Sequence, residues 1–309
     1  TFDNVQTIMQ WAYTNRILKA AEWVAKTNAN VHLVQMTSFG CGPDAFIIDE
    51  VNEILKRHGK SHTILKIDDV NNIGSLRLRI RSLIESLRFA SDKEVTITPL
   101  IKNKIFTEED KHRTILVPFF SEYYSPFVPV LFKLAGYNFV TLPPSDVHSS
   151  ELGLKFANNE VCYPATLVIG DIIKALQTRK YNRDEIAIGI TQTGGQCRAT
   201  NYLSLIKKAM VAAGYEDIPV ISIASGDSLL NPQPGFDVKW RKALTITAVS
   251  MLYADCISKM YYATVVRQKV QGGAVSLRDK YINAALPFAE KKDIRGMLKL
   301  LKQAAAEFN

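Results

Sequence analysis

Short apolar segments rich in β-branched residues alternate with segments of helical periodicity along most of this chain. Such alternation favours parallel strands, because each helix returns the chain to the start of the next strand through a right-handed crossover. The sequence therefore predicts an α/β fold made of two Rossmann-like open parallel-sheet domains with a helical C-terminal segment. The expected strands lie at residues 31–39, 63–67, 114–120, 138–142, 186–191 and 220–223, and the expected helices at residues 45–57, 75–88, 126–135, 150–158, 165–177 and 199–213.

Two changes in composition divide the chain. Residues 89–113 are polar and irregular, which indicates a connection between domains. After Pro232 and Pro234 the pattern becomes helical, over residues 239–268 and 278–308, and we expect these helices to cover a sheet face or bridge the domains. The predicted parts are residues 1–100, an N-terminal helical segment plus a βαβα unit; residues 101–235, a second α/β domain; and residues 236–309, C-terminal helices that pack on the α/β domains.

The formal net charge is +8, but the basic residues are scattered among 30 acidic ones without a long basic tract. Together with the lack of a nucleic-acid-binding motif, this argues against a nucleic-acid partner. The densest basic segment has Arg77, Arg81 and Arg88 at helical spacing. These side chains could contact phosphates or an acidic protein, although a solvated helix face is the favoured interpretation.

No apolar stretch of the sequence is long enough to span a bilayer, and the N-terminus lacks the basic and apolar segments of a secretion signal. We therefore expect a cytoplasmic protein that makes no membrane contact. The chain begins at Thr1, without a methionine, in a helical pattern, which indicates part of a larger polypeptide. In a reducing compartment the four cysteines would not form a disulfide framework.

Three of the cysteines, Cys41, Cys162 and Cys197, stand where a predicted loop leads into a predicted helix. The carboxyl ends of parallel strands meet at one edge of a sheet, where ligands collect. A helix N-terminus also lowers a thiol's pKa and favours the thiolate that metals require. Three such thiolates would suit one anionic iron–sulfur cluster. Cys256, inside an apolar helix, is expected to be structural.

The glycines Gly40, Gly42, Gly194 and Gly195 permit tight turns and a close approach of the backbone to such a cluster. The glycine pattern alone is also compatible with phosphate binding or with simple tight turns, and it matches neither the dinucleotide nor the P-loop fingerprint. The cysteines are separated by 121 residues (162 − 41) and 35 residues (197 − 162), unlike a ferredoxin motif. Three cysteines would leave one iron open to substrate.

Two simpler interpretations of the cysteines stay open. A lone cysteine is most often a buried small apolar residue. Zinc is the main competing metal, but the five histidines are dispersed, and three cysteines without a histidine make a poorer zinc site.

Two glutamates near the predicted strand ends, Glu122 and Glu160, are candidates for proton transfer if they are buried near a substrate. Helix capping is the alternative role for these polar loops, with Ser125 preceding one predicted helix and Ser149 or Ser150 starting the next.

The three cysteine segments closely resemble those of the large acyl-CoA dehydratase activase-related proteins. The resemblance is carried by SFGCGPDA at residues 38–45, NNEVCYPA at residues 158–165 and TQTGGQCRATNY at residues 191–202, and it extends over most of the chain up to about Ser225. It implies a module like the subunits of 2-hydroxyacyl-CoA dehydratases, in which three cysteines hold each cubane [4Fe-4S] cluster. In that system an ATP-hydrolysing activator delivers a low-potential electron, and a ketyl radical of the acyl-CoA forms. The dehydratases work as two-subunit assemblies, so the resemblance also implies part of an oligomer.

The sequence lacks a nucleotide-binding motif of the activator type, so the resemblance implies the dehydratase-like portion with a separate activator domain or protein as its partner. Three functional hypotheses follow. The first is a [4Fe-4S]-dependent lyase (dehydratase) or reductase that acts on an acyl-CoA-like small molecule. The second is an electron relay or cluster carrier, and the third is a metal-free interaction domain of a larger protein.

Overall fold

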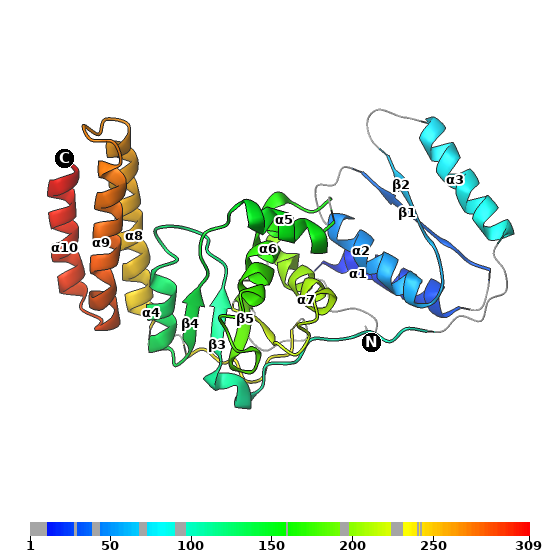
Figure 1. Ribbon diagram of the computed structural model, residues 1–309, viewed down its shortest axis with the longest axis horizontal. Coiled ribbons are helices and arrows are strands. Elements are labelled where there is room, and N and C mark those ends of the chain that lie inside the picture. Colours follow the sequence, from blue (N-terminus) through cyan, green and yellow to red (C-terminus); the bar gives the residue numbers. More distant parts are fainter. Residues whose placement is uncertain are drawn as a thin grey trace.

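The computed structural model is an α/β protein with two parallel sheets, and its elements follow one another in three groups along the chain (Figure 1). It describes residues 11–27, 30–38, 44–67, 73–89, 97–158, 160–191, 198–223, 231–239, 241 and 243–309. The predicted α/β class with parallel strands is thus confirmed. The predicted domain boundaries at residues 100 and 235 stay predictions.

The first group contains a two-stranded parallel sheet, in which Leu33 lies opposite His62. Helices α1 and α2 pack against each other through a core that includes Leu18, Ala21 and Ile54. Helix α3 contacts β2, but none of its residues is buried, so its arginines lie on a solvated face as the sequence indicated. The elements are α1 (Ala12–Lys26), β1 (Leu33–Thr37), α2 (Asp44–Arg57), β2 (His62–Lys66) and α3 (Ile73–Arg88).

The second group is built on a four-stranded parallel sheet in the order β4-β3-β5-β6. The strands are β3 (Thr114–Val117), β4 (Asn138–Thr141), β5 (Ile186–Ile190) and β6 (Val220–Ser222), and the helices are α4 (Phe127–Leu134), α5 (Val147–Phe156), α6 (Tyr163–Gln177) and α7 (Tyr202–Ala212). Every residue of β5 is buried, as expected of a central strand with helices on both faces. Strand β4 lies on one side of β3, whereas β5 and β6 lie on the other side, so the strand order reverses between β3 and β5.

The two faces of this sheet bury different side chains, because successive residues of a strand point to opposite sides. Leu116 and Ile188 pack with α6 and α7 in one core, whereas Ile115 and Ala187 pack with Phe132 of α4 in the other. The first core also contains Ala45 and Phe46 of α2, so the first group is joined to the second by buried apolar contacts.

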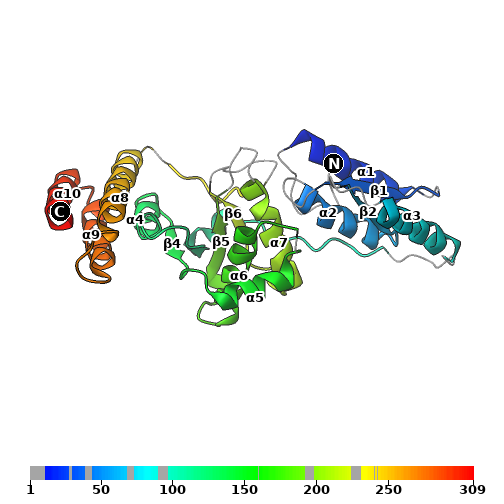
Figure 2. The ribbon, with the colours of Figure 1, turned by 90° about the horizontal axis from the view of Figure 1, so that it is seen from above.

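The C-terminal helices α8 (Leu244–Val265), α9 (Gly273–Glu290) and α10 (Ile294–Phe308) lie side by side next to α4 at one end of the molecule, whereas the β1–β2 sheet lies at the other end (Figures 1 and 2). Their apolar faces form a core with Phe127 of α4 and the neighbouring Tyr123. In the described residues these helices pack on α4, which is a helix of the second group.

The helical character predicted for residues 278–308 is confirmed by α9 and α10, and the chain turns between these two helices. Lys292 adopts a left-handed conformation with φ of 56°, and the side chain of Asp293 accepts a hydrogen bond from the backbone of Gly296 at 2.8 Å. This cap starts a new helix. None of the described helices is long and apolar enough to cross a membrane.

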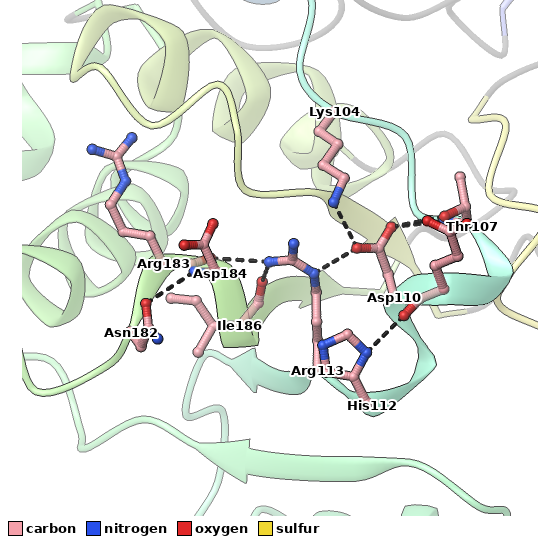
Figure 3. A network of polar contacts seen from close by, with 10 residues as sticks. Lys104, Thr107, Asp110, His112, Arg113, Asn182, Arg183, Asp184 and Ile186 are labelled. Carbon is pink, nitrogen blue, oxygen red and sulfur yellow. Dashed lines mark hydrogen bonds and ion pairs between the residues drawn. The ribbon is translucent and has the colours of Figure 1, made fainter.

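A buried network fixes the amino end of the sheet (Figure 3). Arg113, which immediately precedes β3, donates to the carboxylate of Asp110 at 2.6 Å and to the backbone carbonyls of Arg183 and Ile186 at 3.0 and 2.9 Å. Asp110 also accepts hydrogen bonds from the Lys104 ammonium at 2.7 Å and the Thr107 backbone at 3.0 Å. The segments that lead into β3 and β5 are thereby held together.

Asp110 should make the stability of the protein depend on pH. Burial alone would raise the pKa of this carboxyl, but the hydrogen bonds from Lys104, Thr107 and Arg113 lower it to about 2. Because the folded pKa is depressed, the stabilisation is present above the ordinary pKa of about 4 and is lost as the pH falls towards 2. We expect Asp110→Asn to lower the free energy of unfolding by about 2 kcal/mol at pH 7 in urea titrations.

The difference between Asp110→Asn and the wild type should shrink as the pH falls below about 4. Glu108→Gln is a suitable control, since Glu108 pairs with Lys111 on an exposed surface and should change stability by less than about 1 kcal/mol. Equal losses in the two variants would contradict the role given to Asp110.

Candidate functional site

A cavity of about 340 Å³ lies at the carboxyl ends of β3 and β5. In an open parallel sheet, ligands bind at this edge where the strand order reverses, and here the reversal falls between β3 and β5. The wall is mostly apolar, and Thr191 and Tyr202 supply hydroxyl groups. It is formed by Val117, Pro118, Phe119, Phe120, Val128, Phe132, Val168, Gly189, Ile190, Thr191, Ala199, Tyr202 and Ile223.

Cys162 is joined to this cavity through Tyr202. The thiol is half-buried and free of any disulfide, and its Sγ lies 3.0 Å from the Tyr202 hydroxyl oxygen, within hydrogen-bonding distance. Cys162 is the N-cap residue of α6, with an extended backbone (φ −65°, ψ 142°), and Pro164 lies in the first helical turn. The prediction that Cys162 stands at a helix start is confirmed.

Asn158 fixes the loop before Cys162. Its side-chain oxygen accepts hydrogen bonds from the backbones of Glu160 at 2.7 Å and Val161 at 3.2 Å. Its side-chain nitrogen donates to the carbonyl oxygen of Ala45 at 3.2 Å and to the carboxylate of Asp49, both on α2. The loop is thus held against the first turns of α2.

These contacts bring together segments that adjoin all three predicted cluster ligands. Helix α2 begins at Asp44, three residues after Cys41, and Tyr202 follows Cys197 by five residues. Cys41, Cys197 and the glycines Gly40, Gly42, Gly194 and Gly195 themselves lie outside the described residues. Among the described residues, no group of three or more histidine, cysteine, aspartate and glutamate side chains is arranged to hold a metal ion.

The two candidate glutamates do not line the cavity in the described part of the structure. Glu160 forms an ion pair with Lys66 at the end of β2, and Glu122 is exposed in the loop between β3 and α4. Glu160 therefore links the Cys162 loop to the first sheet. Its candidate role in proton transfer, like that of Glu122, stays a prediction.

The helix starts differ from those expected. Ser125 does not cap α4; its hydroxyl accepts hydrogen bonds from the backbones of Phe120 and Ser121 at 3.0 and 3.1 Å and so closes the loop after β3. Helix α5 begins at Val147, three residues earlier than predicted, because Asp146 is its N-cap and accepts a hydrogen bond from the backbone of Ser149. An aspartate is as good a cap as a serine, which made the serines misleading.

Sequence reasoning named neither Tyr202 nor Asn158 as a site residue. Both stand inside the segments that carry the cysteines, so proximity in sequence was the available signal. Searches of protein-family models, curated proteins and solved structures found no match to this chain.

Proposed function

We propose that this chain binds a [4Fe-4S] cluster through Cys41, Cys162 and Cys197 and acts as a dehydratase-like module in low-potential electron transfer or radical dehydration of an acyl-CoA-type substrate. The observation that carries the proposal is the contact of Cys162 with Tyr202, beside the contact of Asn158 with α2. Through these contacts, segments adjoining three distant cysteines meet at the ligand-binding edge of a parallel sheet. The two parallel sheets would then be two Rossmann-like units that share the site.

The donor set suits the cluster. Cys162 offers a half-buried thiol without a disulfide partner at a helix N-terminus, where the free backbone N–H groups stabilise negative charge. Three thiolates suit an iron–sulfur cluster better than zinc, which prefers a fourth cysteine or histidine. When bound, the cluster would supply one-electron chemistry and an iron that lacks a cysteine ligand.

The residues of the chain would orient the reactants and exclude water. The Tyr202 hydroxyl would donate its hydrogen to Cys162 Sγ and so fix the direction of that sulfur. The apolar wall formed by Val128, Phe132 and Val168 would keep water from the apolar part of a substrate. A low-potential electron would come from an ATP-hydrolysing activator domain or protein, as in the family that the cysteine segments resemble.

The decisive measurement is the iron and acid-labile sulfide content, with EPR spectra, of protein reconstituted without oxygen. We expect about four irons per chain in the wild type and nearly none in Cys41→Ala, Cys162→Ala or Cys197→Ala. Cys256→Ala is the matched control, because Cys256 lies within α8 and should leave the cluster intact. Absent iron, or equal damage from Cys256→Ala, would refute the proposal.

Substrate handling can be tested on the same samples. An acyl-CoA thioester should change the EPR spectrum of the reduced cluster if the open iron meets substrate. A bound, redox-active cluster whose spectrum does not respond to thioesters would identify an electron relay instead.

A further inference from the structure

A second cavity, of about 510 Å³, lies between α4, α8 and the end of β3. Its volume falls within the range of roughly 300–1,000 Å³ that is typical of small-molecule sites. It shares Phe120, Val128, Phe132 and Ile223 with the first cavity, so the two adjoin. The wall consists of Phe120, Ser121, Tyr124, Phe127, Val128, Leu131, Phe132, Ile223, Thr247, Ser250 and Met251.

Two hydroxyl groups in this wall have no hydrogen-bond partner among the described residues. The Oγ1 atom of Thr247 and the Oγ atom of Ser250 are buried and make no hydrogen bond, and Ser250 as a residue is 0% exposed. The two residues are three apart on α8 and therefore lie on one face of the helix. The hydroxyl of a serine or threonine inside a helix commonly donates a hydrogen bond to the backbone carbonyl one turn earlier. Neither Thr247 nor Ser250 does so here.

The other polar groups of the wall are engaged. The Tyr124 hydroxyl donates to the carboxylate of Asp255, and the Ser121 hydroxyl accepts from the backbone of Tyr123 at 3.1 Å. A buried hydroxyl without any partner is destabilising, and Thr247 and Ser250 are the residues of this wall whose hydroxyl groups make no hydrogen bond to the described residues.

The residues of the wall also determine which charge a bound ligand can carry. Among the described residues that form it, none is basic or acidic, so nothing would neutralise a carboxylate or an ammonium group. Phe120 and Met251, which are 64% and 54% exposed, leave apolar surface accessible to a ligand from outside.

We propose that this cavity binds a neutral, mainly apolar small molecule whose carbonyl, hydroxyl or amide group forms hydrogen bonds with Ser250 and Thr247. The proposal goes beyond the cluster assignment and does not depend on it, because no part of the wall is a predicted cluster ligand.

The binding test uses N-phenyl-1-naphthylamine, a neutral probe whose fluorescence rises in apolar surroundings, with octanamide and octanoate as competitors of equal chain length. We expect octanamide to displace the probe at a concentration at least about tenfold lower than octanoate at pH 7. Ser250→Ala should weaken the binding of octanamide by about threefold to tenfold and should change the affinity for the probe by less than about twofold.

A blocking variant locates the site. Met251→Trp adds bulk at the edge of the cavity and should abolish probe binding, whereas Leu252→Trp, at the adjacent exposed position outside the wall, should not. Circular dichroism would verify that both variants are folded. Lack of probe binding by the wild type, stronger displacement by octanoate, or equal effects of the two tryptophan variants would overturn the proposal.

The same variants separate this proposal from the cluster. Met251→Trp should keep the wild-type iron content after reconstitution, since its effect is confined to the second cavity. Iron retained with no probe binding in the wild type would defeat this inference alone, and probe binding without iron would defeat the proposed function alone.

Discussion

Gly170→Ala is expected to lower the free energy of unfolding by about 3 kcal/mol. A Cβ atom at residue 170 would overlap the backbone carbonyl of Ser149, lying 2.6 Å from its carbon and 3.0 Å from the backbone nitrogen of Gly153. These are backbone atoms of α5, which cannot rotate away as a flexible side chain would. Helices α5 and α6 would have to separate, and this cost exceeds the roughly 1 kcal/mol by which alanine favours a helix over glycine.

A shift of α6 in Gly170→Ala would also displace the candidate site, because Cys162 is the N-cap residue of α6. Gly273→Ala is the matched control. A Cβ there would meet only Val270 at 3.8 Å, so stability should change by less than about 1 kcal/mol. Urea unfolding followed by circular dichroism measures both. If Gly170→Ala proves as harmless as Gly273→Ala, the close approach of α5 and α6 is not as described.

The secondary structure was predictable where local patterns decide it. The run at residues 186–191 is short, apolar and β-branched, and β5 spans Ile186–Ile190. The helix expected at residues 165–177 is α6, which begins two residues earlier at Tyr163. In both cases burial against neighbours on two sides agrees with the intrinsic preference of the residues.

The features that the sequence did not predict depend on single residues or on contacts between distant segments. The turn that separates α9 from α10 depends on the left-handed conformation of Lys292, which the composition of the sequence does not indicate. The partners of the candidate site are remote: Cys162 meets Tyr202 across 40 residues, and Asn158 meets Ala45 across 113. The periodicity of a sequence reports which face is buried, not which two helices share that burial.

Lys208→Met is expected to lower the free energy of unfolding by about 3–5 kcal/mol at pH 7. Lys208 on α7 lies 3.2 Å from a carboxylate oxygen of Glu50 on α2, and the two side chains are only 11% and 2% exposed. The Ser204 hydroxyl donates to the same oxygen at 3.1 Å. Removing the ammonium group would leave a buried carboxylate with one neutral donor, in the interface that joins the first group of elements to the second.

The pH dependence of this loss has a definite sign. Burial raises the pKa of Glu50, and the attraction of Lys208 opposes that effect, so the variant should raise the pKa further. A raised folded pKa means that the folded state binds more protons, and its stability increases as the pH falls. The difference in the free energy of unfolding between Lys208→Met and the wild type should therefore be smaller at pH 5 than at pH 7.

A double variant separates the ion pair from the packing of the lysine stem. Glu50→Gln with Lys208→Met removes both charges while an amide oxygen can still accept from Ser204, so we expect it to recover at least half of the single-variant loss. Lys280→Met is the exposed control, since Lys280 pairs with Glu307 at the surface and should lose less than about 1 kcal/mol. A double variant as unstable as Lys208→Met would show that α2 and α7 are joined by the methylene contacts of Lys208 and not by its charge, and the α2 interface would then rest on Ala45 and Phe46.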